Sequence, residues 1–423
     1  MDERDLAAAL RGVLGPVTIE SLTPLPGGAS RQTWSFDAVG GNGSRTPLVL
    51  RRDPPGRPSE PGAMSREARL IGQARAAGLA VPEVLLVTDE PDLWETAGLV
   101  MRRIAGETIG RRILRDAGYR QARKVLVRQV AQFAAGLHAL PVPMDLPSHS
   151  PVPDLRAQLA ILGQTSPVFE LALRTLEASQ PPPRRPVIVH GDLRLGNLIV
   201  GPRSLRAVID WELAHAGNPA EDLGWFCVKA WRFGAGAPAA GLGSRAELLA
   251  AYRDAGGAGI TAEELRWWEI FGTLRWGVMC MSQAWTHLSG AHRSVELAAI
   301  GRRACEQEWD LLLLIDPAAA AQAAARRPHA TGAPWPVPAP HGRPTASELL
   351  DAVREFLTGQ VMPATTGQLS FHARVAANVL SIVARELELG TIPPEAGMAD
   401  NVAARLAVAN PKYFDVMTPE MGS

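Results

Sequence analysis

Eight consecutive residues in the middle of the chain combine the side chains that phosphoryl transfer requires. The segment reads His190-Gly191-Asp192-Leu193-Arg194-Leu195-Gly196-Asn197, and short β-branched runs flank it at 187–189 and 198–200. A third such run, 207–209, ends at Asp210. Transfer of a phosphoryl group needs a carboxylate that orients the attacking hydroxyl and accepts its proton, oxygen ligands for Mg²⁺, and positive charge near the transferred group. This segment and Asp210 together supply all three.

The spacing of these side chains suggests one role for each of them. Asp192 is the predicted catalytic base. Asn197 and Asp210 offer a neutral carbonyl and a carboxylate, which are both hard oxygen ligands that suit Mg²⁺. Arg194, two residues after the base, is placed to reach the transferred phosphate, and His190 is expected to hold the loop geometry. Each residue alone could be structural, but the combination, bracketed by strands, favours catalysis.

These residues resemble the signature of the aminoglycoside phosphotransferase (choline-kinase-like) family, which has a protein-kinase-like fold. The family motif HGDxxxxN, with a later D-W or D-F pair, matches Asp192, Asn197 and Asp210. The resemblance therefore implies a catalytic Asp, two Mg²⁺-binding residues, ATP as phosphate donor and a small-molecule hydroxyl group as acceptor.

One branch of that family, the phosphotransferase domains also found fused to acyl-CoA dehydrogenases, resembles residues 20–315 most closely. The matching segments are Val49–Gly56, Gly191–Leu198, Asp210–Leu213, Gly217-Asn218-Pro219 and Asp222-Leu223. The family commonly has Gly-Asp-Pro at 217–219, and because this Asp lies outside the catalytic trio, we expect a structural effect only. The tail resembles a small helical domain that is often appended to bacterial members.

The resemblance also implies a nucleotide site in the N-terminal part of the chain. Gly27, Gly28 and Ser30 would form a turn over the phosphates, because glycines permit close backbone approach, although an ordinary hairpin turn is the alternative. Arg51 stands where the family usually has Lys, and its permanent charge keeps a phosphate contact possible. Glu67 is its expected ion-pair partner, with a solvated helix position as the alternative.

Met101 ends a predicted strand where the family has its hinge, whose backbone would hydrogen-bond the nucleotide base. Neither residue type nor spacing distinguishes adenine from guanine here. We therefore expect ATP and Mg²⁺ as cofactors, with GTP left open.

The elements that must position these residues predict an α+β, two-lobed kinase-like fold. Strand patterns at 17–19, 33–36, 48–50, 84–88 and 98–102 indicate a small antiparallel sheet, with helices predicted at 4–14 and 65–77. From about residue 104 the pattern turns helical, with a long amphipathic segment at 121–140. The predicted parts are an N-lobe at 1–103, a C-lobe at 104–316, a Pro/Ala-rich linker at 317–344 and a helical domain at 345–423.

The last of these parts begins at a plausible capping box, Thr345-Ala346-Ser347-Glu348, and has a strong helix pattern at 371–389. This C-terminal helical domain could mediate self-association. The oligomeric state itself is not specified by the sequence.

The composition excludes several other classes of protein. Lys plus Arg and Asp plus Glu both total 43, so no net positive field indicates a nucleic acid or an anionic membrane as partner. The three cysteines are widely spaced, which is typical of reduced thiols, and no apolar run is long enough to cross a bilayer. Since the charged N-terminus also lacks a signal-peptide core, we expect a cytoplasmic protein.

The acceptor alcohol is not specified by the motif. Polycationic aminoglycosides require a strongly acidic acceptor surface, whereas between 210 and 315 arginines offset the acids, which favours a non-antibiotic acceptor. The resemblance to the dehydrogenase-fused branch suggests a hydroxyacyl thioester or another small metabolite. Six tryptophans could line the acceptor pocket or belong to the core: Trp225, Trp231, Trp267, Trp268, Trp276 and Trp285.

Three other functions stay open. A pseudokinase or nucleotide-binding module is suggested by the Arg at 51 and by the appended domain. A true antibiotic kinase is the second, and a protein kinase is the most remote, because Asp210 is followed by Trp-Glu rather than Phe-Gly.

Overall fold

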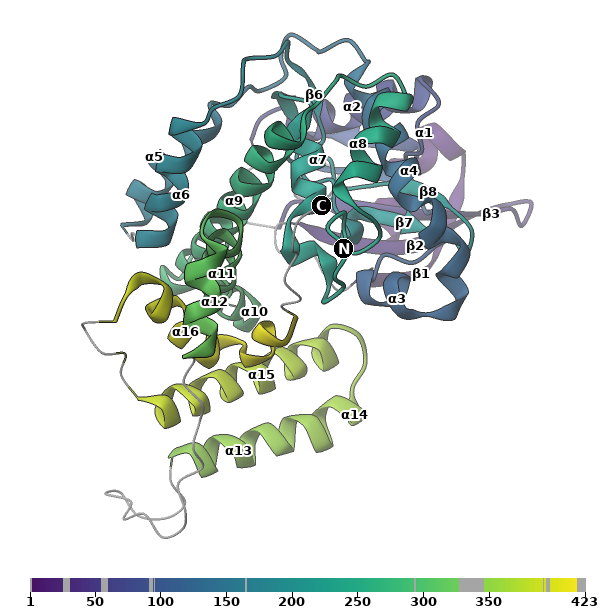
Figure 1. Ribbon diagram of the computed structural model, residues 1–423. Coiled ribbons are helices and arrows are strands. Elements are labelled where there is room, and N and C mark those ends of the chain that lie inside the picture. The colour runs from purple at the N-terminus through teal and green to yellow at the C-terminus, as the bar shows by residue number, and fades with distance from the viewer. Residues whose placement is uncertain are drawn as a thin grey trace. The chain divides into compact units, whose positions relative to one another are not determined.

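The computed structural model describes residues 2–25, 31–54, 60–90, 94, 96–163, 166–292, 294–326, 346–390, 392 and 396–416. The chain forms two units, one of residues 1–149 and 181–269, the other of residues 150–180 and 270–423 (Figure 1). Helix α9 (Ala262–Leu288) has residues in both units. The predicted phosphate-binding turn with Gly27, Gly28 and Ser30 lies outside the described residues, as does the linker from residue 327 onward.

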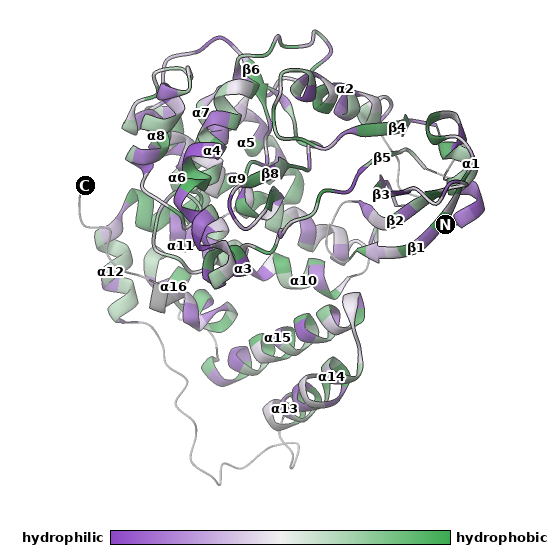
Figure 2. Ribbon diagram, turned by 90° about the vertical axis from the view of Figure 1, so that its right-hand side faces the viewer, coloured by the Kyte–Doolittle hydropathy of each residue, from purple (hydrophilic) through white to green (hydrophobic). Residues whose placement is uncertain are grey.

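The first unit begins with an antiparallel sheet of five strands in the order β1-β2-β3-β5-β4. Its alternating residues bury one face, where Phe36, Leu48 and Leu50 are fully buried. Figure 2 colours β4 mostly green, because Val84 to Val87 is an uninterrupted aliphatic run. The strands are β1 (Val17–Leu25), β2 (Gln32–Gly40), β3 (Arg45–Arg52), β4 (Val84–Thr88) and β5 (Gly98–Arg102).

Two helices pack on this sheet. Helix α1 (Glu3–Leu14) is capped by Asp2, whose carboxylate accepts the N–H of Arg4, and it buries Leu6 and Leu10. Helix α2 (Ala63–Ala76) packs on β4 and β5 and buries Glu67 among apolar neighbours. A buried carboxylate on an apolar helix face requires a charged partner.

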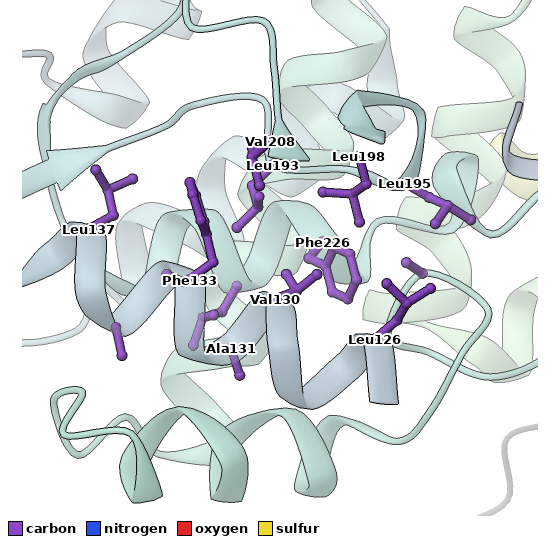
Figure 3. Packing of buried hydrophobic residues seen from close by; sticks show 14 of the residues in the cluster. Leu126, Val130, Ala131, Phe133, Leu137, Leu193, Leu195, Leu198, Val208 and Phe226 are labelled. Carbon is purple, nitrogen blue, oxygen red and sulfur yellow. The ribbon is translucent and has the colours of Figure 1, made fainter. Parts of the chain in front are cut away.

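The helical part of the first unit is built around α4 (Arg120–His138). Leu126, Val130, Phe133 and Leu137 follow one face of α4 and pack against residues of the predicted catalytic segment and its strands, such as Leu193 (Figure 3). The core of this unit therefore lies directly beneath the segment 190–197. The other helices are α3 (Gly110–Arg115), α7 (Ala220–Cys227) and α8 (Arg245–Asp254).

Two short two-stranded sheets hold the predicted catalytic segment at its ends. Strand β6 (Val187–Val189) pairs with β9 (His215–Gly217), and β7 (Leu198–Val200) pairs with β8 (Leu205–Val208), both antiparallel. One 3-10 turn, Leu195–Asn197, leads into β7. The fold class predicted from the sequence is confirmed: an antiparallel N-terminal sheet, a helical C-terminal part and an additional helical region.

The second unit is helical throughout the part that the structure describes. Helix α13 packs against α15, and α16 packs against α11 and α15 (Figure 1). Its helices are α5 (Pro151–Leu162), α6 (Pro167–Ala178), α10 (Val295–Arg302), α11 (Ala304–Ile315), α12 (Pro317–Ala325), α13 (Ala346–Phe356), α14 (Met362–Ala364), α15 (Gly367–Leu389) and α16 (Met398–Ala409).

Helix α12 corrects the local structure predicted for the start of the linker. The Asp316 carboxylate accepts the N–H of Ala319, and Pro317 occupies the first turn, where its missing N–H does no harm. The alanine run that follows has the highest intrinsic helix propensity, so Pro317–Ala325 is helical. The proposed capping residues Thr345 and Glu348 lie outside the described side chains.

Helix α11 carries three buried acids, Glu306, Glu308 and Asp310, and each meets a polar partner near the C-terminus. Asn410 donates to Glu306 over 3.0 Å, and the Tyr413 hydroxyl donates to Asp310 over 2.7 Å. Arg405 lies 2.7 Å from Glu308. These contacts join α11 to α16 and to the 3-10 turn Pro411–Val416.

Among the residues in the ranges given above, no helix is both long enough and apolar enough to cross a bilayer.

Candidate active site

The buried carboxylate of Asp222, on α7, binds the backbone at the start of the segment 190–197. The backbone N–H groups of His190 and Gly191 donate to the two oxygens of Asp222 over 2.8 and 3.0 Å. His138 Nε2 donates to the same carboxylate over 3.2 Å, so its Nδ1, 2.7 Å from the Tyr252 hydroxyl, is the acceptor there. Burial alone would raise the pKa of Asp222, but these donors outweigh it and lower the pKa.

Gly191 adopts a conformation that only glycine accommodates here. Its φ is +78°, and a Cβ at this position would lie 2.3 Å from the carbonyl oxygen of Leu213. The tight turn brings Asp192 into the site immediately after β6.

His190 supports the loop and is not placed to act as the base. Its Nδ1 accepts the N–H of Asp192 over 3.2 Å, so the proton of the neutral ring is on Nε2. The ring is fully buried and lies against the Trp211 indole, with 4.9 Å between ring centroids. Burial lowers the pKa of His190 below its ordinary value of 6.5, in spite of the negative charges of Asp222 and Asp192.

This lowered pKa predicts a loss of stability in acid. As the pH falls below about 6.5, the unfolded chain binds a proton at His190 that the folded chain does not, so stability is fully present above that pH and is lost on acidification. The lowered pKa of Asp222 acts in the same direction at lower pH. We expect the melting temperature to fall between about pH 7 and pH 5, with a shallower slope for His190→Gln. A profile that is flat, or that rises on acidification, would contradict this assignment.

Three donors converge on the carboxylate of Asp192, whose side chain is 12% exposed. Asn197 Nδ2 donates to Oδ2 over 2.6 Å, and Trp225 Nε1 donates to Oδ1 over 2.8 Å. The Arg194 Nε–H is shared between both oxygens, at 3.0 and 3.1 Å. The predicted base is therefore oriented by its own loop and by α7.

Arg194 contacts the predicted base and an aromatic ring. Besides Asp192, its guanidinium carbon lies 4.8 Å from the centre of the Trp231 ring, a cation–π contact. The side chain is partly exposed, so it lies at the site, beside the base. Its predicted contact with a phosphate stays a prediction.

The two predicted Mg²⁺ ligands are neighbours. The N–H of Ile209 donates to the backbone oxygen of Asn197 over 3.0 Å, which holds Asp210 beside the loop. Asp210 has a φ of +72°, a left-handed conformation that is strained for an Asp residue and is frequent at functional positions. The structure therefore brings the two residues together at one end of β8, and their role as Mg²⁺ ligands stays a prediction.

Arg51 forms the ion pair expected with Glu67 and a second one with Asp210. Arg51 Nη1 lies 2.9 Å from Glu67 Oε1, and Nη2 lies 2.6 Å from Asp210 Oδ1. Burial alone would raise the pKa of Asp210, but the charges of Arg51 and then Arg194 lower it below the ordinary value. Burial alone would lower the pKa of Arg51, and the charges of Asp210 and Glu67 raise it instead.

Arg31 is a site residue that sequence reasoning missed. It pairs with Glu67, and its Nε lies 3.2 Å from Asp53 and 3.4 Å from Glu212. Arg31 directly follows the predicted glycine turn, and this position in the sequence could have identified it as a site residue. Glu67 therefore has two guanidinium partners.

Met101 lies inside β5, one residue before the end of the strand. Its register partners are Val49 on β3 and Val84 on β4, and its side chain is buried with Met64 and Leu99. The connection that follows β5 begins at Arg103, and the backbone contact predicted for Met101 with a nucleotide base stays a prediction.

The fold and this site define a kinase-like phosphotransferase. The model of the phosphotransferase enzyme family matches residues 21–268, and the chain belongs to that family. A second model, a domain of unknown function (DUF6285), matches residues 363–400.

Individual relatives agree with this assignment. Mouse acyl-CoA dehydrogenase family member 10 is 30% identical over 194 residues, which are 43% of this chain and 18% of that protein, so this chain spans under a fifth of the relative's length. A Ralstonia eutropha protein classed with the aminoglycoside phosphotransferases has a TM-score of 0.55 at 20% identity, covering 73% of this chain and 98% of that one.

An aminoglycoside phosphotransferase solved with AMP-PNP and hygromycin B has a TM-score of 0.50 at 17% identity, covering 74% and 99% of the two chains. At these identities the likeness of the solved structures shows the fold.

Proposed function

We propose that this chain is an ATP-dependent O-phosphotransferase that transfers the γ-phosphate to a hydroxyl group of a small, non-polycationic molecule, with Asp192 as the base. The observation that carries the proposal is the hydrogen bond from Asn197 Nδ2 to Asp192 Oδ2, 2.6 Å long, beside the backbone contact that brings Asp210 to Asn197. The loop and the end of β8 thus bring a buried, oriented carboxylate together with two side chains that could supply oxygen ligands.

Asp192 would accept the proton of the acceptor hydroxyl as its oxygen attacks the γ-phosphorus and the bond to the ADP oxygen breaks. The hydrogen bond from Asn197 would hold the carboxylate in place during this step. Arg194, beside the base, would stabilise charge on the transferred group.

The residues present fit Mg²⁺. Asn197 uses its amide N–H groups on Asp192, over 3.0 Å to the backbone oxygen and 2.6 Å to Oδ2, so its carbonyl oxygen is available as a ligand. A cation, the Arg51 guanidinium, already lies 2.6 Å from Asp210. In the described part of the chain no three His, Cys, Asp or Glu side chains surround a common ion position. Mg²⁺ bound with a nucleotide commonly uses only one or two protein groups, and it would neutralise phosphate charge here.

Loss of the Asp210 carboxylate should therefore weaken Mg²⁺-dependent nucleotide binding. We expect Mg-ATP to raise the melting temperature of the wild-type chain, with a much smaller shift for ATP without Mg²⁺. Asp210→Asn should weaken Mg-ATP binding by roughly tenfold or more, since even outer-shell changes at metal sites cost about 10–100-fold in affinity. The matched control is Asp254→Asn, because the side chain of Asp254 is 75% exposed. Equal Mg-ATP affinity in Asp210→Asn and wild type would contradict the metal assignment.

Three buried acids of the helical region support an acceptor that is not a polycation. Glu264 lies 2.6 Å from Arg184, and Glu221 lies 3.1 Å from His215. Glu269 is bound by two arginines, at 2.9 and 2.7 Å. These carboxylates are occupied within the fold, so they do not form an acidic surface for an aminoglycoside.

A hydroxyacyl thioester is the acceptor that we propose first. The mouse relative is named as an acyl-CoA dehydrogenase family member, which supports this class. The test is a screen of hydroxyacyl-CoAs, other hydroxylated metabolites and kanamycin-type compounds with purified protein, Mg-ATP or Mg-GTP, and a readout of nucleotide consumption. Efficient phosphorylation of the kanamycin-type compounds would overturn the acceptor class.

A nucleotide-binding module without turnover is the second candidate, and the pair between Arg51 and Asp210 favours it. In that case the Arg51 guanidinium would remain bound permanently to the Asp210 carboxylate, the predicted metal ligand. Binding of Mg-ATP without any acceptor-dependent or water-dependent turnover would select this alternative.

A further inference from the structure

Trp225 touches the predicted base from outside the catalytic loop. The other two donors, Arg194 and Asn197, belong to the loop itself, whereas Trp225 is on α7 and donates its indole N–H to Asp192 Oδ1 over 2.8 Å. We propose that Trp225 is a positioning residue that sets the rotation of the Asp192 carboxylate toward the acceptor hydroxyl. The inference rests on the proposed function, because it takes Asp192 as the base.

The hydrogen-bond pattern gives Trp225 a task that the loop does not perform. The rotation of a carboxylate about its last torsion is soft and broadly populated. Arg194 Nε–H is shared between both oxygens, and Asn197 restrains only Oδ2 through its side chain. Trp225 is the donor specific to Oδ1, so it completes the restraint on the second oxygen.

The helix that carries Trp225 is itself rigidly held. Three residues earlier, Asp222 accepts the N–H groups of His190 and Gly191. One residue earlier, Gly224 approaches α9 so closely that a Cβ would lie 2.5 Å from the Cβ of Trp268. Helix α7 thus holds both the backbone and the reactive side chain of the loop, which is the arrangement that preorganised sites require.

A second tryptophan, Trp231, contacts both Trp225 and Arg194, which is another donor to Asp192. The Trp225 and Trp231 rings lie 5.3 Å apart, and the Arg194 guanidinium lies over Trp231. Asp192, Arg194, Trp231 and Trp225 therefore form a closed ring of contacts. Trp225 is only 2% exposed, and core packing alone would account for its burial, but not for an N–H directed at a carboxylate.

The test removes the indole N–H of Trp225 and retains an aromatic side chain at this position. Trp225→Phe is the first variant, and the second places 3-benzothienylalanine, a tryptophan isostere with sulfur in place of N–H, at position 225. Trp94 is the control for both changes, because it is also buried and its indole N–H has no hydrogen-bond partner among the described residues. The assay is phosphate release from Mg-ATP with water as acceptor: water attacks the γ-phosphorus, ADP leaves, and the proton passes to Asp192 and then to solvent.

We expect both changes at 225 to slow phosphate release by roughly 10- to 100-fold, which corresponds to one hydrogen bond to a charged group, with the KM for ATP within about twofold. The same changes at 94 should leave the rate near wild type. In an Asp192→Asn background, Trp225→Phe should cause no further loss, whereas a purely structural role would give the same loss in both backgrounds.

If the isostere at position 225 gave a wild-type rate, or if Trp225→Phe caused equal losses in both backgrounds, the positioning role alone would be wrong. The effect of Asp192→Asn would still test whether Asp192 is the base. Unchanged turnover in Asp192→Asn would overturn the proposed function, and the positioning role with it.

Discussion

Replacing Asp192 with asparagine should lower turnover by roughly 10²–10⁴-fold or more while Mg-ATP affinity stays near that of the wild type. The substitution removes the group that accepts the hydroxyl proton but leaves Asp210 and Asn197 in place. It also turns an acceptor-only group into one with an amide N–H, which must face Asn197, Arg194 or Trp225, all of them donors. Steady-state rates would measure turnover, and calorimetric titration with Mg²⁺ and AMP-PNP, a non-hydrolysable analogue of ATP, would measure the nucleotide affinity.

Two controls make the result specific. Melting temperatures of wild type and variant exclude unfolding as the cause, and Asp254→Asn repeats the chemical change at an exposed position. Turnover equal to that of the wild type in Asp192→Asn would show that another group is the base.

Asp222→Ala should destabilise the first unit by roughly 3–5 kcal/mol, because each buried donor that loses its acceptor costs about 1–3 kcal/mol. Asp222 is fully buried, and its removal leaves the N–H groups of His190 and Gly191 and the ring of His138 without their common acceptor. Unfolding by denaturant, followed by circular dichroism, would measure the difference.

Asp222→Asn is the graded comparison for this prediction. It keeps one acceptor oxygen of the same shape and loses the charge, so we expect a smaller loss than for alanine. A loss below about 1 kcal/mol for Asp222→Ala would mean that water or a rearranged loop replaces the carboxylate.

Local patterns in the sequence predicted the strands well where an apolar run had clear ends. Strands β4 (Val84–Thr88) and β5 (Gly98–Arg102) occur with the predicted bounds, because uninterrupted apolar runs read as buried strands. The start of the linker was predicted from the high content of Pro and Ala in this part of the sequence. The structure has helix α12 there, since Asp316 and Pro317 form a helix start and the alanines continue it.

The site was predictable where its residues are close in sequence. The spacing of five between Asp192 and Asn197 brings both onto one loop, and the strand end brings Asp210 beside them. The contact of Trp225 with Asp192 joins residues 33 positions apart, and that of Arg31 with Glu67 joins residues 36 apart. Such contacts depend on how helices and sheet pack, and no local periodicity reports this packing.

The three buried acids of α11 affect how a protein of this architecture can change during evolution. Asn410 and Tyr413 donate to Glu306 and Asp310, and Arg405 lies beside Glu308. Glu306 also accepts from Arg303, and Glu308 also accepts from Ser166. A lineage that lost the appended helices in one step would remove part of the compensation that these carboxylates receive for their lost hydration. We therefore expect loss of the appendage to cost less stability when substitutions of these acids in α11 accompany it.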